Sequence, residues 1–397
     1  MLSFQFVAKA KLFVLSCLLC STGIALGMFM PGYAQHRSFL RQTPLVQPEY
    51  GFTKRGGVFR VDAGGNFSSY GLNSRGEFYN YWNNPDLLRV SPNGSMIYIG
   101  GQQYMTSDSK EKTFIETYRL FPNGAIRLIG SFAHGTSNDY PSALAFGAKG
   151  RFLYLLTVHE AVNKNYFSDL STYRCDSLGR VTQLAGSKPR IAAPSLNRAD
   201  MISDPTGRFV YITQPDNRTI KQYRVSANGL LKPLSPTAVS LPQTPSTLVF
   251  PPGTPFLYVV SAKDNSLTQL RMSANGTLQM SHFFRFGSVK RTIDPILAIS
   301  PNGRFLYVAD DTLPVTRQFA IGADGALQPL SPPTAAFSPN YIAVDLTNRF
   351  AYLVDNGVAN QQLIYPYRIS PTGSLVRIKG DPASGVYPES LTFAQPR

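Results

Sequence analysis

The chain has 397 residues, a formal net charge of +15 and a hydrophobic content of 43%, with 21 Tyr and 26 Phe. Such a content excludes an intrinsically disordered chain and is enough for a large core. The basic residues are scattered without a run of five like charges, which argues against a specific nucleic-acid-binding protein. A generally cationic soluble surface is the simpler interpretation of the charge, and binding to a polyanion is an open alternative.

The first 34 residues are expected to be a signal peptide. Lys9 and Lys11 precede the apolar run Leu12–Met30, and the small residues Gly32 and Ala34 suit a cleavage site. Cleavage after Ala34 would export the mature chain to the periplasm or the medium. The alternative is an uncleaved anchor, because 19 largely apolar residues nearly span a bilayer. Outside this segment one thiol is left, Cys175, which cannot form an internal disulfide.

Residues 35–55 are expected to be irregular, and a repeat occupies residues 56–397. The repeat is clearest at Ser300–Asp311, SPNGRFLYVADD, a tight turn followed by a strand with two apolar faces. Both faces must therefore be covered, as in stacked sheets. Related phrases begin at Ser91, Gly147, Asp204, Phe250 and Asp345.

Each repeat also has an opening strand and a closing hairpin. A short apolar strand, often after Pro, precedes the turn, as at Pro245-Ser246-Thr247, where Pro gives up no ladder hydrogen bond. A hairpin with a Gly turn follows, as in QYRVSANGLLKPL at Gln222–Leu234. The unit thus contains four antiparallel strands, which we name a, b, c and d in chain order, and it forms one blade of a β-propeller.

Counting the strands predicts an all-β, seven-bladed propeller. The hairpin at Val58–Tyr70 has no strand a before it, and the strand a at Ser390–Ala394 has no hairpin after it. These two segments are expected to share a blade and close the ring, with strand b taken from residues 38–58 or missing.

Alternating strand directions place the short a–b and c–d turns at one face, here named the turn face. The longer b–c and d–a connections lie at the other, the loop face, where a site is expected. Among these expected loops are Gly101–Glu116, Ser131–Tyr140 and Val158–Ser171. Polar residues expected there could supply a base, an acid and a cation for a carbonyl oxygen. They equally resemble the polar rim of any propeller. The candidate catalytic residues are His134, His159, Glu160, Arg198 and Asp200, and the candidate ligand-binding residues are Asp86, Asp139, Asp216, Arg291, Asp294, Asn340 and Glu389.

No motif points to a cofactor or metal, and none is expected. The sequence lacks an H-x-H, an H-E-x-x-H, a Cys pair with metal-ligand spacing, a P-loop and a dinucleotide fingerprint. The Phe-x-Tyr pairs, such as Phe152/Tyr154 and Phe305/Tyr307, are interpreted as core residues and not as a base-stacking surface, because they recur inside strand b.

The phrase SPNGRFLYVADD and the hairpin pattern Y-R-x-x-x-x-G-x-L resemble the lactonase-type seven-bladed propellers. These include 6-phosphogluconolactonase-like and YVTN-repeat proteins, and the likeness runs from about Val58 to the C-terminus. Enzymes of that family tend to carry a His-Pro-His-like phrase before strand a of a central blade. The matching positions here, Tyr140–Ser142 and Asn197–Asp200, contain no histidine.

Two functions therefore stay open. The first is an exported binding module that holds a small molecule, glycan or protein on its loop face. The second is a hydrolase of lactones or related esters, in which His134 or His159 with Glu160 is the base and Arg198 stabilises the oxyanion. The chain is expected to be a monomer and to reach a membrane only through an uncleaved N-terminal segment.

Overall fold

The chain divides into two compact units, Met1–Val46 and Gln47–Arg397, and the computed structural model describes residues of the second unit only. The predicted signal peptide and its cleavage site therefore lie outside the described residues. The described ranges are 49–53, 57–72, 87–105, 110–134, 139–161, 165–185, 190–191, 199–261, 266–285, 296–310, 315–336, 339, 341–355, 363–380, 382–384 and 391–394.

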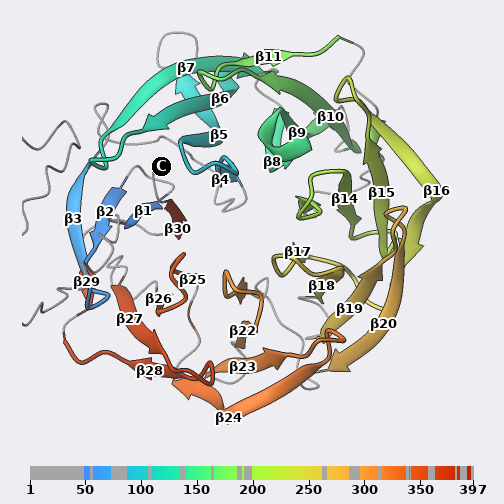
Figure 1. Ribbon diagram of the computed structural model, residues 1–397. Coiled ribbons are helices and arrows are strands. Elements are labelled where there is room, and N and C mark those ends of the chain that lie inside the picture. The colour runs from blue at the N-terminus through green and yellow to red at the C-terminus, as the bar shows by residue number, and fades with distance from the viewer. Residues whose placement is uncertain are drawn as a thin grey trace, which may run out of the picture. The chain divides into compact units, whose positions relative to one another are not determined.

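The second unit is a ring of seven antiparallel sheets, which confirms the predicted fold (Figure 1). Strand a of each blade lies nearest the centre and strand d at the outside. Blade 1 contains β4 (Leu88–Val90), β5 (Met96–Met105), β6 (Lys110–Leu120) and β7 (Ile126–His134). Blade 2 contains β8 (Asp139–Gly147), the 3-10 turn η2 (Ala148–Gly150), β9 (Phe152–Ala161), β10 (Asn165–Cys175), β11 (Val181–Gln183) and β12 (Arg190–Ile191).

The next blades repeat this order. Blade 3 contains β13 (Met201–Ser203), β14 (Phe209–Gln214), β15 (Thr219–Val225) and β16 (Leu231–Ser240). Blade 4 contains β17 (Thr247–Val249), β18 (Phe256–Ser261), β19 (Ser266–Met272) and β20 (Leu278–Arg285). Blade 5 contains β21 (Leu297–Ile299), β22 (Phe305–Asp310), β23 (Val315–Ile321) and β24 (Leu327–Ala336). Blade 6 contains β25 (Tyr341–Val344), β26 (Phe350–Asp355), β27 (Leu363–Ile369), β28 (Leu375–Arg377) and β29 (Ala383–Ser384).

The two ends of the propeller share blade 7, as predicted. The C-terminal strand β30 (Leu391–Ala394) pairs with β1 (Glu49–Thr53), which pairs with β2 (Gly57–Val61) and then β3 (Phe67–Leu72). Strand b is thus β1, which lies inside the segment 35–55 that was expected to be irregular. That boundary was wrong because EYGFT lacks the turn phrase, although its alternate residues Tyr50 and Phe52 are buried at 2% and 3% exposure.

A recurrent pair of contacts joins neighbouring blades. The strand-b tyrosine hydroxyl donates to the carbonyl of the c–d turn glycine in the next blade, at 2.5 to 3.0 Å, and the strand-b phenylalanine ring packs against the same glycine. The pairs are Tyr154–Gly229, Tyr211–Gly276, Tyr258–Gly325, Tyr307–Gly373 and Tyr352–Gly65. The Phe-x-Tyr pairs are therefore core residues, as predicted, and a buried hydroxyl there has its required partner.

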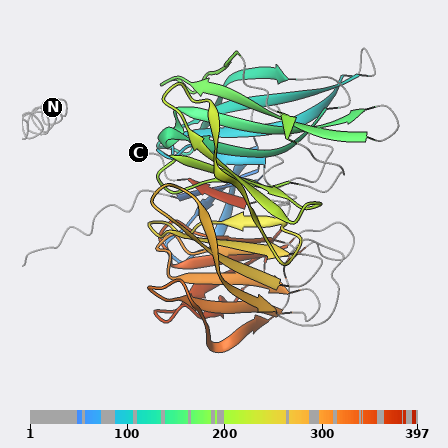
Figure 2. The ribbon, with the colours of Figure 1, turned by 90° about the vertical axis from the view of Figure 1, so that its right-hand side faces the viewer.

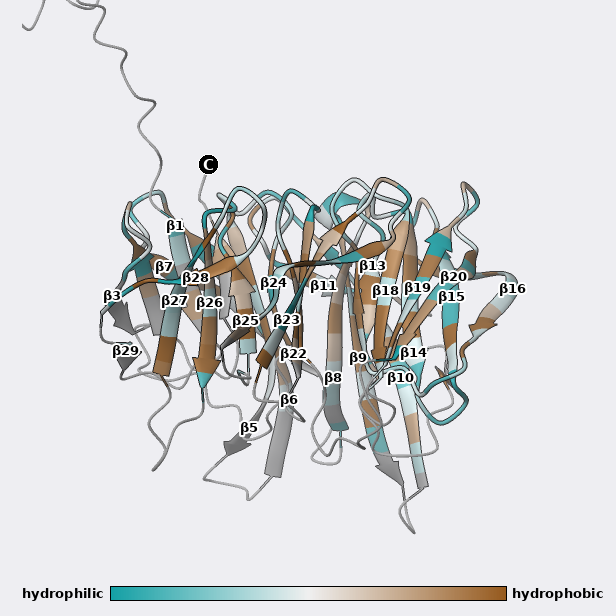
Figure 3. Ribbon diagram, turned by 90° about the horizontal axis from the view of Figure 1, so that it is seen from below, coloured by the Kyte–Doolittle hydropathy of each residue, from teal (hydrophilic) through white to brown (hydrophobic). Residues whose placement is uncertain are grey.

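Blades 1 and 2 differ from blades 3 to 6 in the length of their middle strands. Strands b and c have 10 and 11 residues in blades 1 and 2, but 6 and 7 residues in blades 3 to 6. Figure 2 shows the teal and green strands of blades 1 and 2 reaching beyond the others at one face, and Figure 3 shows β9 and β10 extending on the side opposite the short turns.

These extensions correct the predicted connections. Gly101–Glu116, Ser131–Tyr140 and Val158–Ser171 were expected to be long loops, but most of their residues belong to paired strands. The prediction was wrong because these segments are rich in polar residues, which are typical of loops. Polar residues are also compatible with a half-covered strand at the end of a blade, where one face of the strand leaves the apolar core.

Candidate functional site

Three neighbouring strands of blade 2 bring two carboxylates to one imidazole. Asp139 at the start of β8 lies opposite His159 on β9, and His159 lies opposite Phe167 on β10. Asp169 is two residues further along β10, and therefore on the same face of the sheet as Phe167. The long strands of blade 2 thus place Asp139, His159 and Asp169 together near the loop face.

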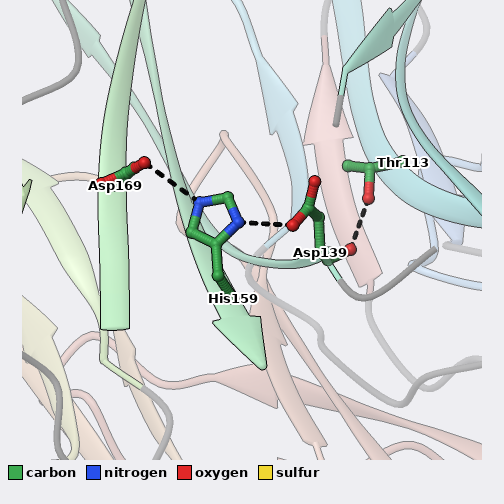
Figure 4. Close-up of polar contacts among 4 residues, drawn as sticks. All are labelled: Thr113, Asp139, His159 and Asp169. Atoms are coloured by element: carbon green, nitrogen blue, oxygen red, sulfur yellow. Dashed lines mark hydrogen bonds and ion pairs between the residues drawn. The ribbon is translucent and has the colours of Figure 1, made fainter. Parts of the chain in front are cut away.

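The imidazole of His159 lies between the two carboxylates (Figure 4). Its Nδ1 is hydrogen-bonded to Asp139 Oδ1, and its Nε2 lies 3.4 Å from Asp169 Oδ2. The ring stacks on Phe167 with centroids 4.7 Å apart and planes at 21°. An ionised carboxylate only accepts hydrogen bonds, so the bond to Asp139 assigns the Nδ1 proton and leaves the Nε2 lone pair toward Asp169 when the ring is neutral.

This cluster lies at the interface between blades 1 and 2. His159 shares its sheet face with Leu155, which packs in the core between these two blades. The hydroxyl of Thr113, on β6 of blade 1, donates to the carbonyl of Asp139 at 2.5 Å. His159 and Asp169 keep 16% and 20% of their side-chain surface exposed, although the Nε2 atom of His159 is itself buried.

The cluster has two polar atoms with incomplete hydrogen bonding. Nε2 of His159 is buried and, in spite of its 3.4 Å approach to Asp169, makes no hydrogen bond among the described residues. The buried hydroxyl of Thr157, directly opposite Asp169, also makes none there. Because buried polar groups are nearly always satisfied, these are the atoms that a bound water or a polar ligand would contact.

The chemistry available to this arrangement is proton transfer. An imidazole whose Nδ1–H is held by a carboxylate can take a proton at Nε2 and return it, which is the action of a general base followed by a general acid. Metal binding is a poorer fit, since the two carboxylates lie on opposite sides of the ring. Within the described ranges no group of three or more His, Cys, Asp or Glu side chains is arranged to hold a metal ion.

The structure brings together only some of the predicted site residues. Asp139, predicted to bind ligand, contacts the predicted catalytic His159. The backbone of His134, at the end of β7, pairs with Thr113, which places it beside this cluster. Glu160 follows His159 on β9, and the side chains of His134 and Glu160 lie outside the described part. Also outside the described residues are Asp86, Arg198, Arg291, Asp294, Asn340 and Glu389.

Asp200 forms hydrogen bonds to the backbone of blades 3 and 4. It is 5% exposed, and its carboxylate accepts the backbone N–H of Met201 and that of Leu248 in blade 4, both at 2.7 Å. These bonds join the inner strands of blades 3 and 4. Asp216 is exposed in the b–c turn of blade 3. The catalytic and binding roles assigned to these two residues stay predictions.

Sequence reasoning missed Asp169. It treated residues 158–171 as a loop, in which side-chain direction has no pattern. In the strand that forms, Phe167 and Asp169 share one face and lie opposite His159 and Thr157, so treating this segment as a strand paired with β9 would have placed a carboxylate beside His159.

The chain belongs to the family of lactonases with a seven-bladed β-propeller, whose description matches residues 66–321. The fold is similar to that of the periplasmic gluconolactonase PpgL of Pseudomonas aeruginosa, with a TM-score of 0.66, 17% identity and coverage of 87% of this chain and 98% of that one. It is also similar to a candidate 6-phosphogluconolactonase of Bacteroides fragilis, with a TM-score of 0.67, 13% identity and coverage of 89% and 99%.

A structure from Lactobacillus plantarum gives a TM-score of 0.65 at 16% identity, over 87% of this chain and 99% of that one. At these identities the likeness shows the fold alone. No curated protein sequence matches the chain. Across the described ranges, the structure contains no helix with the length and apolar character needed to cross a membrane.

Proposed function

We propose that the chain hydrolyses lactones, with His159 as the general base. The observation that carries the proposal is the bond between His159 Nδ1 and Asp139, on a ring whose Nε2 has no hydrogen bond of its own in the described part. Membership of the lactonase family supports the reaction class, and the names of the Pseudomonas and Bacteroides proteins support a sugar lactone as the substrate.

The reaction needs one proton to move twice. Nε2 of His159 takes a proton from a water molecule as its oxygen attacks the lactone carbonyl carbon. The ring C–O bond then breaks, and the same proton returns to the departing alkoxide oxygen, so that a lactone and water give a hydroxy acid. Asp139 keeps the imidazole in the required tautomer and orientation. Asp169 is placed to hold the attacking water beside Nε2.

The oxyanion partner is predicted to be Arg198. A cation near the carbonyl oxygen would stabilise the charge that develops in the transition state. Arg198 precedes β13 of blade 3, and the first described residue after it, Ala199, is buried. An Arg198→Lys variant should keep part of the activity that Arg198→Ala loses.

The decisive experiment compares two histidines that differ in their surroundings. His159→Gln should lower the rate of δ-lactone hydrolysis by a factor of about 100 or more, the usual contribution of a general base. His282→Gln is the matched control, because His282 is exposed on β20 of blade 4 and stacks only on Phe284. Equal rates for wild type and both variants would reject the proposal.

Binding through the loop face is the second candidate function. The specific observation in its favour is the extension of the b–c hairpins of blades 1 and 2, which gives this face a raised wall on one side. A small molecule, a glycan or a protein segment could lie against it. If His159→Gln binds sugar acids as tightly as the wild type and neither protein hydrolyses lactones, the binding module is the better description.

Export of the chain belongs to the same proposal. The apolar run Leu12–Met30 after Lys9 and Lys11 has the order of a signal peptide, and one structural relative is named as periplasmic. We expect the mature chain to begin at Gln35. N-terminal sequencing of protein from the cell envelope or medium tests this, and a retained Met1 would favour the N-terminal anchor.

A further inference from the structure

We propose that the turn face of the propeller docks on a membrane surface that contains anionic phospholipids. The turn face is the end of the ring that carries the short a–b and c–d turns, and Figure 3 shows these turns on the side opposite the extended ends of β9 and β10. The proposal does not depend on the proposed hydrolase function, because it concerns the other face and different residues.

Besides Arg60 of blade 7, nine exposed arginines of the described part lie before strand b or near the end of strand c at this face. Four of them directly precede strand b, and five lie near the end of strand c, so the pairing of these strands sets them side by side, as for Arg224 opposite Phe209. In the described part none of the nine forms an ion pair with a carboxylate. They are Arg151, Arg208, Arg304 and Arg349 before strand b, and Arg119, Arg174, Arg224, Arg271 and Arg368 on strand c.

Several of these guanidinium groups are held in place. Arg208 and Arg224 both lie over the ring of Phe209, at 5.3 and 5.4 Å from its centroid. Arg151, Arg304 and Arg349 lie over the following phenylalanine in the same way, at 5.1 to 5.5 Å. A planar group that is already oriented loses less entropy when it binds a phosphate with two parallel hydrogen bonds.

The Nε–H of two of these arginines already has a partner. Arg208 Nε donates to Thr206 Oγ1 and Arg349 Nε to Thr347 Oγ1, both at 3.0 Å. In the described part, the terminal amino groups of these two guanidiniums make no hydrogen bond to the protein, and they are the ones that a phosphodiester would engage.

Acidic residues on this face do little to offset the arginines. The exposed carboxylates of the described c–d turns, Asp62, Asp176 and Asp324, accept backbone N–H groups of their own turns at 2.8 to 3.0 Å. Asp204 and Asp345 are buried and cap the a–b turns. Among the described residues of this face, the exposed arginines therefore outnumber the three exposed aspartates.

The entry point of the chain selects a membrane among the anionic partners. Strand b runs from the turn face to the loop face, and β1 is the strand b of blade 7. Its first residue, Glu49, accepts the backbone N–H of Leu346 in an a–b turn at 2.6 Å. The preceding 48 residues, with the apolar run Leu12–Met30, therefore join the propeller at the arginine face. An apolar run that enters or stays in a bilayer is thus connected to the propeller through this face.

Co-sedimentation of the full-length protein with lipid vesicles tests the proposal. Vesicles of phosphatidylcholine with phosphatidylglycerol should bind the wild type, and vesicles of phosphatidylcholine alone should not. An arginine near an anionic surface contributes about fivefold in affinity, so Arg208→Gln with Arg304→Gln should weaken binding by at least about tenfold. High salt should abolish the difference.

A matched double variant removes the same charge from the opposite face. Arg218 lies in the b–c turn of blade 3 and Arg285 at the loop-face end of β20, and both are exposed. Arg218→Gln with Arg285→Gln should bind vesicles like the wild type. An equal loss in both double variants would show that only net charge matters and would overturn the proposal. Unchanged vesicle binding by the turn-face variant, or retention on a sulfated polysaccharide without any vesicle binding, would also overturn it.

Discussion

Blades 2 and 3 are built from the same repeat but end differently at the loop face. In blade 3, strands b and c stop after 6 and 7 residues and a turn follows at Asp216. In blade 2 they continue for 10 and 11 residues, and the added pairs carry His159 and Phe167. Closer to the turn face, the same strands of both blades belong to the core, and Tyr154 and Tyr211 are fully buried. The difference teaches that the repeat maintains the ring, and that longer middle strands can add polar residues at the loop face without disturbing it.

The largest expected effect is on lactone hydrolysis, through the His159 cluster of blade 2. Asp139→Asn should lower kcat for lactones by about 100-fold with little change in KM, because an amide can donate to Nδ1 and thereby place the imidazole proton on Nε2. A rise in KM together with a fall in thermal stability would instead indicate that Asp139 only supports the fold. Asp324→Asn is the control, because that side chain caps a turn at the opposite face.

The next prediction concerns the contact that recurs between neighbouring blades, in which a strand-b phenylalanine packs against a c–d turn glycine. Gly276, in the c–d turn of blade 4, has φ +92°, and an added Cβ would lie 2.2 Å from Cδ1 of Phe209 in blade 3. Gly276→Ala should lower the free energy of unfolding by about 3 kcal/mol, since a left-handed backbone and an overpacked interface both act against alanine.

Urea unfolding measures this loss, and Gly253→Ala is its control. Gly253 has φ +72° but nothing within 4 Å of an added Cβ, so it should lose only the backbone part, about 1 kcal/mol. Equal losses for the two variants would mean that the contact between Phe209 and the turn contributes little to joining blades 3 and 4.

Blade 7 provides a third comparison, because its strand b comes from the other end of the propeller. Glu49 is 5% exposed, and its burial raises the pKa of its carboxyl group from 4.5 to about 7. The hydrogen bond from the backbone N–H of Leu346 acts in the opposite direction, and the negative charge of Asp345 adds to the rise. Below pH 4.5 the carboxyl is protonated in both the folded and the unfolded chain. Between pH 4.5 and 7 the folded chain binds more protons, so the free energy of unfolding falls as the pH rises.

This penalty should reach about 3 kcal/mol above pH 7, an order-of-magnitude figure from the pKa shift. In Glu49→Gln the amide oxygen can still accept the N–H of Leu346, but the group does not titrate. The variant should therefore show a flatter stability curve between pH 5 and 8 in urea unfolding. Identical pH dependence in wild type and variant would contradict the raised pKa.

The ring could be predicted from the sequence because its determinants are local and repeated. A turn such as SPNG, then Phe-x-Tyr on one face of a strand, recurs often enough to fix the blade count and the pairing of Leu391–Ala394 with the N-terminal segment. Strand β1 was placed only within a range, since EYGFT has no turn phrase before it. The site was less predictable, because Asp139, His159 and Asp169 are separated along the chain and their proximity depends on where β9 and β10 end.

The smallest effect concerns a single hydroxyl in the shared part. Tyr307 in blade 5 is fully buried and donates to the carbonyl of Gly373 in blade 6 at 2.7 Å. Tyr307→Phe should lower the free energy of unfolding by about 1 kcal/mol, because the carbonyl loses its hydrogen bond while the ring still packs. In blade 7, Phe52 occupies the position on strand b that Tyr307 occupies in blade 5, and its ring is buried at 3% exposure although it has no hydroxyl group. The contact between blades thus depends chiefly on the packed rings, and a loss well above 2 kcal/mol in Tyr307→Phe would show that the hydroxyl contributes more than the ring.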